Sequence, residues 1–453
     1  MLNIHPGRRR RVLTIALSAI VVAGAAAPAL AQATAQIPLQ FDFQTPGARS
    51  MGMGGAFIGA ADDASAAFTN PAGLAFLTAA GKRELTAEGR FSSIETPFLS
   101  GGRISGSVTG KGIDTVPNPI YGSDTDREAR PGFVSLLVPV KGVVITVYRQ
   151  EMVGLENTFF SDGVFERFTF AGITDDNNRE IPLGGTRRIQ ISSYGGSLGY
   201  KFNDRVAVGA GLAVNHFTLQ SDFARFGFAS SIFGPVNRDI QSATATQTGD
   251  DIGISANAGL LVKVSDRVQL AGTVRRGARF EFSQRDRVFD AGLDLTRTGH
   301  FKVPDVFGAG LQWRVGDNTR VLVDYDRVQY SQLKHDFIDI QSLSSGRQDQ
   351  IQVDDANELH GGFEYQLLRS GDAKPLAFRA GAWFDPAHAP RYNSTPAHDQ
   401  LDVLLSAALP GGPNLVHYTF GAGVLLMNSV ELNGAADLSK RTTAATVSIV
   451  LRF

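Results

Sequence analysis

The feature that most constrains this chain is a two-residue rhythm of apolar side chains. Between Ile252 and Val264, apolar residues occupy every second position, and the positions between them are mostly small or polar. Successive side chains of a β-strand point to opposite faces, so this rhythm predicts strands with one apolar face. The same alternation recurs at residues 206–215, 358–367 and 442–453. We therefore expect an all-β protein.

Two all-β architectures contain such strands: a soluble sandwich with its apolar faces inside, and a transmembrane barrel with its apolar faces toward lipid. Several runs reach about ten residues, the length of a tilted strand that crosses a bilayer. The connections also alternate in length, which is typical of outer-membrane barrels. Short connections fall at residues 141–142, 203–204, 265–266 and 316–318, and long ones at 94–130, 154–186, 222–249, 286–302, 334–355 and 387–413.

These observations favour a transmembrane antiparallel β-barrel of about 14 strands, an even number that returns both chain ends to the same side. The strands are centred near residues 88, 136, 147, 195, 212, 257, 275, 309, 325, 362, 380, 421, 434 and 447, and residues 154–186 leave room for one further pair. A barrel of this size has a lumen that wall side chains alone do not fill. A plug is therefore expected.

The segment before the first strand is the expected plug. Residues 47–77 lack the strand alternation and contain helix-compatible stretches at 60–68 and 74–77. Asp62 and Asp63 supply carboxylates that stabilise a helix start, and Pro71 ends the helix. We assign residues 32–82 to an N-terminal helical hatch and residues 83–453 to the barrel.

Residues 1–31 have the features of a secretory signal peptide. Arg8–Arg11 form a positive region, Val12–Ala27 an apolar core, and Ala29–Ala31 a small-x-small cleavage site. The alternative is a membrane anchor, which the polar residues that follow do not favour. The sequence thus predicts an exported protein of the bacterial outer membrane. The terminal Phe453 resembles the signal by which the outer-membrane assembly machinery recognises barrels.

Charge and composition exclude several classes of function. The formal net charge is −1, and no basic block follows the first residues, so we expect no nucleic-acid partner. The chain has no Cys, so its stability must come from hydrogen bonds and packing. Gly195–Gly199 matches the nucleophile-elbow pattern of hydrolases, but it continues into a strand where that motif needs a helix. We predict neither an enzyme nor a cofactor or metal site.

Two short motifs carry a resemblance to a known family. Asp62–Ala66, followed by Asn70-Pro71-Ala72-Gly73-Leu74, resembles the hatch motif of the FadL/TodX family of outer-membrane hydrocarbon transporters. Residues 303–305, 324–331 and 378–381 are similar to later strands of that family. The resemblance spans the mature chain and identifies Asn70, Pro71 and Ala72 as the hatch motif.

The resemblance implies passive uptake of long-chain fatty acids or other hydrophobic molecules through the outer membrane and its lipopolysaccharide. In this family the substrate enters a groove in the extracellular loops, moves to an inner pocket and leaves sideways beside the hatch. The family's gap lies in the third strand, here Val143–Met152, which contains no Gly or Pro. An alternative within the same broad family is a non-transporting, PorV-like barrel that serves as a secretion scaffold or shuttle.

Two sets of residues are candidates for substrate binding. The hydrophobic groove would consist of loop residues that could equally form a small cluster of their own, namely Phe223, Phe226, Phe228, Ile232 and Phe233. For a carboxylate, we expect Arg275 and Arg379 among the inward-facing cations Arg275, Arg279, Arg314 and Arg379. The alternative is that these cations form ion pairs across a wet lumen with inward acids, namely Glu281, Asp324, Glu358, Glu364 and Asp385.

Overall fold

The computed structural model describes residues 43, 45–80, 82–170, 172–180, 182–334, 347–367, 376–394, 400–426 and 429–453. The predicted signal peptide and residues 32–42 of the predicted hatch lie outside the described residues. Among the helices of the described part, none is long and apolar enough to cross a membrane.

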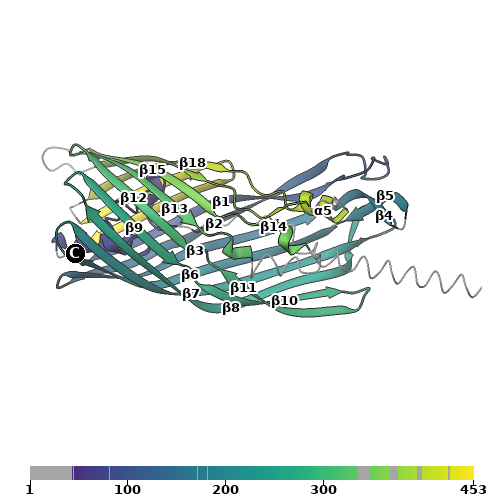
Figure 1. Ribbon diagram of the computed structural model, residues 1–453, viewed down its shortest axis with the longest axis horizontal. Helices are drawn as coiled ribbons and strands as arrows, with labels where there is room; N and C mark the ends of the chain where they lie inside the picture. The colour runs from purple at the N-terminus through teal and green to yellow at the C-terminus, as the bar shows by residue number, and fades with distance from the viewer. Residues whose placement is uncertain are drawn as a thin grey trace, which may run out of the picture.

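Most described residues belong to strands (Figure 1). The strands of the N-terminal half are β1 (Glu84–Gly102), β2 (Pro119–Val140), β3 (Val143–Ser161), β4 (Val164–Phe170), β5 (Ile173–Glu180), β6 (Leu183–Lys201), β7 (Val206–Phe228) and β8 (Val236–Lys263). The strands that follow are β9 (Val268–Arg276), β10 (Arg279–Val288), β11 (Leu293–Lys302), β12 (Val306–Val315), β13 (Thr319–Val328), β14 (Ile351–Gln352), β15 (Ala356–Leu367), β16 (Leu376–Asp385), β17 (Arg391–Tyr392), β18 (Leu415–Leu426), β19 (Val430–Leu438) and β20 (Thr442–Arg452). The helices are α2 (Ala48–Gly52), α3 (Ala66–Thr69), η1 (Pro71–Ala80), η3 (Gln348–Gln350) and α5 (Gln400–Ala408).

The main sheet closes into an antiparallel barrel of 14 strands. Closure occurs at β8, which pairs with β7 on one side and with both β9 and β10 on the other. The β10–β11 hairpin extends the wall beyond the ring, and all the predicted strand centres lie in strands of the ring. The extra pair for which residues 154–186 left room is the β4–β5 hairpin, which forms a separate small sheet.

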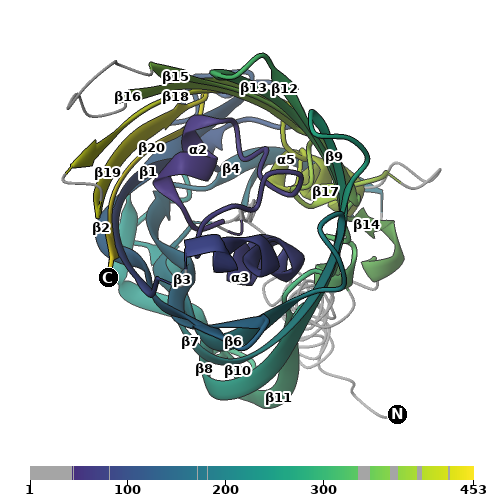
Figure 2. The same cartoon turned by 90° about the vertical axis from the view of Figure 1, so that its left-hand side faces the viewer.

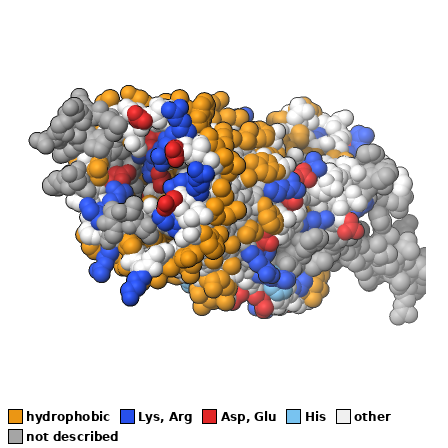
Figure 3. Space-filling model, turned by 60° about the vertical axis from the view of Figure 1, so that its left-hand side comes forward, with side chains coloured by type: hydrophobic (Ala, Val, Ile, Leu, Met, Phe, Trp, Pro, Cys, Tyr) orange, Lys and Arg blue, Asp and Glu red, His pale blue; other side chains and the backbone are white. Residues whose placement is uncertain are grey.

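The apolar faces of the strands point outward, as the alternation predicted. Leu212 is 65% exposed, Ile254 71% and Val447 66%, whereas their chain neighbours Ala213 and Ser448 are buried. On the face drawn in Figure 3, the apolar side chains form a band across the barrel, with charged side chains on either side of it. Because exposed apolar bands of this kind match a lipid environment, the soluble sandwich is excluded.

The barrel is occupied by the segment that precedes β1. In the view along the barrel, α2 and α3 lie inside the ring of strands (Figure 2). The η1 helix packs against β6, β7 and β8, and α2 packs against β18 and β19. At the end of the barrel where the connections are long, strands β1–β8 and β10–β11 extend beyond the ring and enclose an apolar cluster that includes Phe159, Phe217, Phe223 and Phe280.

Candidate functional site

The Asn-Pro-Ala segment is fixed at the bottom of the lumen by its asparagine. Asn70 is fully buried, and its side-chain amide donates to the carbonyl oxygen of Ile58 at 3.0 Å. Its side-chain oxygen accepts the backbone N–H of Ala72 at 3.2 Å, across Pro71, which has no N–H of its own. Asn70 therefore holds the turn between α3 and η1 in one conformation.

Wall side chains bind the carbonyl oxygens at the end of α3. Ser197 donates to the Ala67 oxygen at 2.6 Å, Asn257 to the Phe68 oxygen at 2.8 Å, and Thr273 to the Thr69 oxygen at 3.0 Å. The last carbonyls of a helix have no partner within the helix, so these donors stabilise its end. The Gly195–Gly199 stretch thus belongs to strand β6 and holds the hatch.

Glycines in the wall allow the hatch to approach the strands closely. A Cβ atom at Gly209 would lie 2.2 Å from the backbone carbon of Pro71, and one at Gly259 would lie 1.9 Å from the side-chain oxygen of Asn70. Both distances are shorter than any van der Waals contact. Even an alanine at these two positions would displace the Asn-Pro-Ala segment.

The other half of the hatch is held by charge. Arg49 of α2 lies 2.7 Å from Asp62 and 3.1 Å from Glu364 of β15. Arg320 of β13 also pairs with Asp62, at 2.6 Å, and Arg379 of β16 pairs with Glu364 at 2.7 Å. Burial raises the pKa of Asp62, but the two guanidinium groups outweigh it and lower that pKa to about 2. This network fixes α2 to the wall.

Between the hatch and the apolar cluster lies a mostly apolar cavity of about 190 Å³. Its lining includes Phe68 of the hatch and Arg275 of β9, whose guanidinium carbon lies 5.1 Å from the centre of the Phe68 ring. Other lining residues come from the hatch and from the strands around it, namely Phe43, Met51, Ile94, Tyr148, Met152, Val303, Val306, Val328 and Tyr330.

The barrel wall is interrupted where this cavity meets β8. Pairing of β8 with β9 ends at Ala256 and Arg276, and pairing with β10 begins only at Thr248 and Ser283. The strands approach again at Gly253, where a Cβ atom would lie 2.8 Å from the Arg279 carbonyl oxygen. The interruption is therefore short, and we call it the β8 break.

Two side chains bind the backbone of Gly277, which lies between β9 and β10 at the β8 break. The Lys302 ammonium donates to the Gly277 carbonyl oxygen at 2.8 Å, and Asp305 accepts the Gly277 N–H at 2.9 Å. Lys302 and Asp305 also pair with each other at 2.6 Å. Asp305 follows Pro304, which separates β11 from β12 and cannot donate to a ladder. The Val303-Pro304-Asp305 motif therefore stabilises the break.

A second hollow of about 620 Å³ lies against the β8 break. It is lined by Ile254, whose side chain faces outward, and by Arg279 and Lys302. The residues that line both this hollow and the lumen cavity are Ser255, Ala256, Arg276 and Gly277. The lumen cavity and the outer hollow thus meet at the β8 break.

The wall is also interrupted between β2 and β3, which stop pairing beyond Phe133 and Gln150. A bulge follows, because the register of β3 with β6 shifts between Glu151 and Val153. We call this interruption the β3 break. Arg130 fills it and pairs with Glu128 and, at 3.3 Å, with Glu151. The space left there is about 10 Å³, enough for about one water molecule.

A family model described as outer membrane protein transport protein (OMPP1/FadL/TodX) matches residues 31–401. The chain belongs to the FadL/TodX family. It is accordingly an outer-membrane protein, and the end of the barrel with long connections is the extracellular one. The predicted family, fold and location are confirmed.

Solved structures of FadL/TodX proteins show the same fold. A Pseudomonas aeruginosa FadL homologue matches with a TM-score of 0.59 and 16% sequence identity, over 91% of this chain and 99% of that one. The P. putida toluene transporter TodX matches with a TM-score of 0.58 and 14% sequence identity, over 91% of this chain and 99% of that one. The Ralstonia pickettii toluene transporter TbuX matches with a TM-score of 0.55 and 14% sequence identity, over 91% of this chain and 100% of that one. No curated protein sequence matches.

The groove residues predicted from the FadL/TodX resemblance lie in different surroundings. Phe223 is 3% exposed, inside the extracellular apolar cluster, with its ring centre 5.2 Å from that of Phe159. The other four are partly exposed. Phe226 contacts Phe160, Phe233 stacks on Phe165, and Arg179 lies 4.6 Å from the ring centre of Phe228. Packing of this kind corresponds to the alternative of a loop cluster.

The two arginines predicted to bind a carboxylate also differ. Arg379 is buried and is bound by Glu364 and by Asn433, at 2.9 Å, as the ion-pair alternative expected. Arg275 lines the apolar cavity, and within the described residues no acidic group lies within ion-pair distance of it. The structure therefore leaves Arg275 as the candidate cation for a ligand.

The alternation predicted that Arg279 and Glu281 face inward, and this prediction is wrong. Both are exposed, and Phe280 and Phe282 are buried instead. The reason is that Gly277 and Ala278 separate β9 from β10 and change the register of the strand. The sequence reasoning also missed Lys302 and Asp305 as parts of the site, although Pro304 inside an otherwise alternating stretch was a signal for an interrupted strand.

Proposed function

We propose that this barrel is a passive channel for the uptake of hydrophobic molecules, with lateral release through the β8 break. The observation that carries this proposal is the meeting of the apolar lumen cavity with the outer hollow at Ser255, Ala256, Arg276 and Gly277. An apolar molecule in this cavity can leave toward lipid without passing the Arg49–Glu364 charge network below it. The overall transfer of an apolar molecule from water to lipid is favourable because its apolar surface leaves water, so no energy source is needed.

The size of the cavity favours compact ligands. An engineered apolar cavity of about 150 Å³ binds benzene, and the lumen cavity here measures about 190 Å³. Two related solved structures are described as toluene transporters and another as a monoaromatic hydrocarbon channel. We infer that a single-ring hydrocarbon fits the cavity as it stands, whereas a long-chain fatty acid would need the outer hollow as well.

Arg275 gives the cavity a means to hold a carboxylate. Its guanidinium borders the Phe68 ring, so a fatty acid could place its carboxylate there and its chain along the apolar lining. A neutral aromatic molecule would not need this contact. The two ligand classes should therefore depend differently on Arg275.

The proposal is tested by uptake into vesicles that contain the purified barrel. Radiolabelled toluene and a labelled long-chain fatty acid are offered to matched vesicles with and without protein. We expect protein-dependent accumulation of at least one of them, and Arg275→Met should weaken fatty-acid binding while toluene binding stays unchanged. A PorV-like scaffold predicts no protein-dependent uptake of either ligand, and that result would refute the channel.

A further inference from the structure

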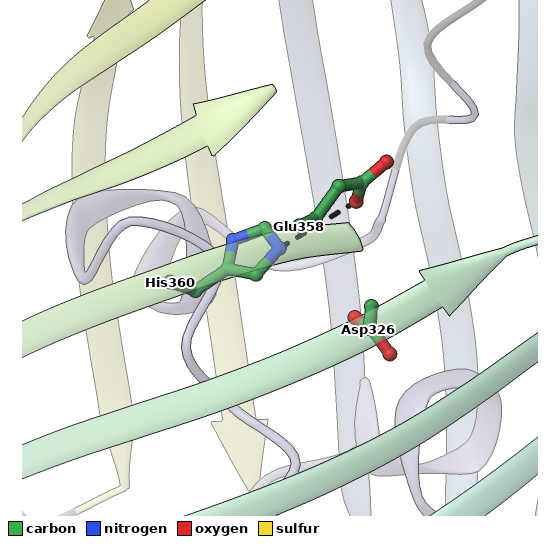
Figure 4. Close-up of side chains that lie close together, drawn as sticks. All are labelled: Asp326, Glu358 and His360. Atoms are coloured by element: carbon green, nitrogen blue, oxygen red, sulfur yellow. Dashed lines mark ion pairs between the residues drawn. The ribbon is translucent and has the colours of Figure 1, made fainter. Parts of the chain in front are cut away.

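Two carboxylates and an imidazole converge on the lumen face of β13 and β15 (Figure 4). Asp326 lies directly opposite Glu358 in the pairing of these strands, and His360 is two residues further along β15. One oxygen or nitrogen of each side chain lies within 4.8 Å of the other two. Like charges directly opposite each other destabilise a sheet, so this pair of acids needs a compensating group.

The described residues supply no Lys or Arg nitrogen within 4.0 Å of either carboxylate. Within the described residues, the basic group within ion-pair distance of Glu358 is the imidazole of His360, whose Nε2 lies 3.6 Å from Glu358 Oε2, beyond hydrogen-bond distance. An oxygen of Asp326 is buried without a hydrogen-bond partner. The nearby Asp324 accepts the backbone N–H of Ile58 at 2.6 Å and adds a third carboxylate.

The orientation of the histidine indicates what the compensating group is. His360 Nδ1 lies 2.7 Å from the carbonyl oxygen of Gly54 in the hatch, and a carbonyl oxygen can only accept, so Nδ1 carries the hydrogen. The ring stacks on Trp383 at 5.3 Å between ring centres, which fixes its plane. Nε2 thus points toward the two carboxylates, and it is buried without a hydrogen-bond partner among the described residues.

This arrangement matches a metal ligand set. A histidine that donates Nδ1–H to a backbone carbonyl and directs Nε2 into a cluster of carboxylates is the usual arrangement of a metal-bound imidazole. A second proton on His360 would allow it to pair with Glu358 but would leave Asp326 without a partner. A divalent cation would compensate both carboxylates at once.

We propose that Asp326, Glu358 and His360 bind one divalent transition-metal ion of the Zn²⁺ type. Nitrogen and carboxylate oxygen donors are those that Zn²⁺ takes, and three protein ligands leave a further position open toward the cavity. Because His360 is also bound to Gly54, the metal would fasten the hatch to β13 and β15. This inference does not depend on what the barrel transports.

Equilibrium dialysis of the purified full-length protein against Zn²⁺, with metal analysis of the retained sample, tests the proposal. We expect saturable binding of one Zn²⁺ per chain. Asp326→Asn and Glu358→Gln keep the size of the side chains and should each weaken binding about tenfold or more. His216→Gln changes an exposed histidine on the outside of the barrel, which pairs with Asp250, and should leave binding unchanged.

Two outcomes would overturn the proposal. One is the absence of saturable Zn²⁺ binding in the folded barrel. The other is binding that both Asp326→Asn and Glu358→Gln retain, or that His216→Gln removes. As a second readout, hydrogen exchange at Gly54–Ala56 should slow when Zn²⁺ is added to the native protein and should not respond in Glu358→Gln. Exchange that is insensitive to Zn²⁺ in the native protein would contradict the fastening of the hatch.

Discussion

The β3 break and the β8 break interrupt the same barrel wall and leave very different spaces. At the β3 break, Arg130 lies between Glu128 and Glu151, and about 10 Å³ remain. At the β8 break, Lys302 and Asp305 bind the backbone of Gly277 from one side, and a hollow of about 620 Å³ meets the lumen cavity. Loss of strand pairing alone therefore does not make an opening. What matters is which side chains satisfy the backbone that is left unpaired.

The difference also concerns chemistry. A hydrophobic molecule that crossed the β3 break would have to displace the partly buried ion pairs of Arg130 with Glu128 and Glu151, and removal of one partner leaves a charge uncompensated. At the β8 break the lining that is shared with the cavity consists of the small residues Ser255, Ala256 and Gly277 together with Arg276. We therefore expect release at β8, and the following predictions test this comparison in order of decreasing effect.

The largest effect is expected from Ser255→Trp. The indole would fill the point where the lumen cavity and the outer hollow meet. Uptake should fall about tenfold or more, because the ligand would then have no other apolar route out of the cavity. Uptake of labelled toluene into protein-containing vesicles measures the effect. Ser255→Ala, which adds no volume, is the matched control and should behave like the native protein. Normal uptake by the Trp variant would mean that the ligand does not leave the barrel through the β8 break.

Asn70→Ala should reduce uptake several-fold without unfolding the barrel. Asn70 binds Ile58 and Ala72 and packs against Gly259 of β8, so its loss disturbs the hatch next to the β8 break. The uptake assay gives the rate, and heat-modified migration on gels shows whether the barrel is intact. An unchanged uptake rate would mean that the conformation of the hatch at Asn70 does not affect transport.

Asp305→Ala tests how the β8 break is stabilised. The variant leaves the Gly277 N–H without its acceptor. It also removes the carboxylate that pairs with Lys302, whose ammonium keeps only the Gly277 and Val303 carbonyl oxygens. A donor left unsatisfied away from water costs about 1–3 kcal/mol. We expect a lower unfolding midpoint in denaturant than for the native barrel. Asp317→Ala, in an exposed short turn, is the control and should have no effect. Equal stability of both variants would mean that Asp305 does not support the break.

Arg130→Ala should change uptake less than twofold. It removes the guanidinium from the β3 break, which in our account is not the route of release. The same vesicle assay applies, with Arg127→Ala on the same strand as control. A large increase in uptake by Arg130→Ala would show that this break, and not the β8 break, limits release.

The smallest effect concerns the extracellular hairpin β4–β5. Burial, together with the neighbouring Glu180, raises the pKa of Glu166 to about 8. The unfolded hairpin loses this proton near the ordinary value of 4.5 and the folded one near 8, so its stability should decrease as the pH rises from 4.5 to 8. Proteolysis of the hairpin should be faster at pH 8.5 than at pH 5.5, and Glu166→Gln should remove the difference. A pH-independent rate in the native protein would contradict this.

The alternation predicted strands with one apolar face, because lipid outside and polar groups inside impose a period of two on every wall strand. The length of the strands and the alternation of short and long connections then favoured the barrel over a soluble sandwich. The motif Asn70-Pro71-Ala72 predicted a hatch segment, and the helix η1 that begins at Pro71 packs against β6, β7 and β8. The inward direction of Arg279 and Glu281 was predicted wrongly, because Gly277 and Ala278 separate β9 from β10 and change the register. An interruption of only two residues cannot be recognised from the alternation of apolar and polar residues. The sequence also did not indicate which arginines Glu364 of β15 would pair with. Its partners are Arg379 on β16 and Arg49 in the hatch, and the second contact depends on how the hatch packs against the wall.

The most direct test of the account is a crystal structure of the native barrel with a brominated toluene, located by the anomalous signal of bromine. We predict a peak in the lumen cavity between Phe68 and Arg275, and a second peak at Ser255 and Gly277 in the β8 break. A peak beside Arg130 in the β3 break, or no peak inside the barrel, would contradict release through β8.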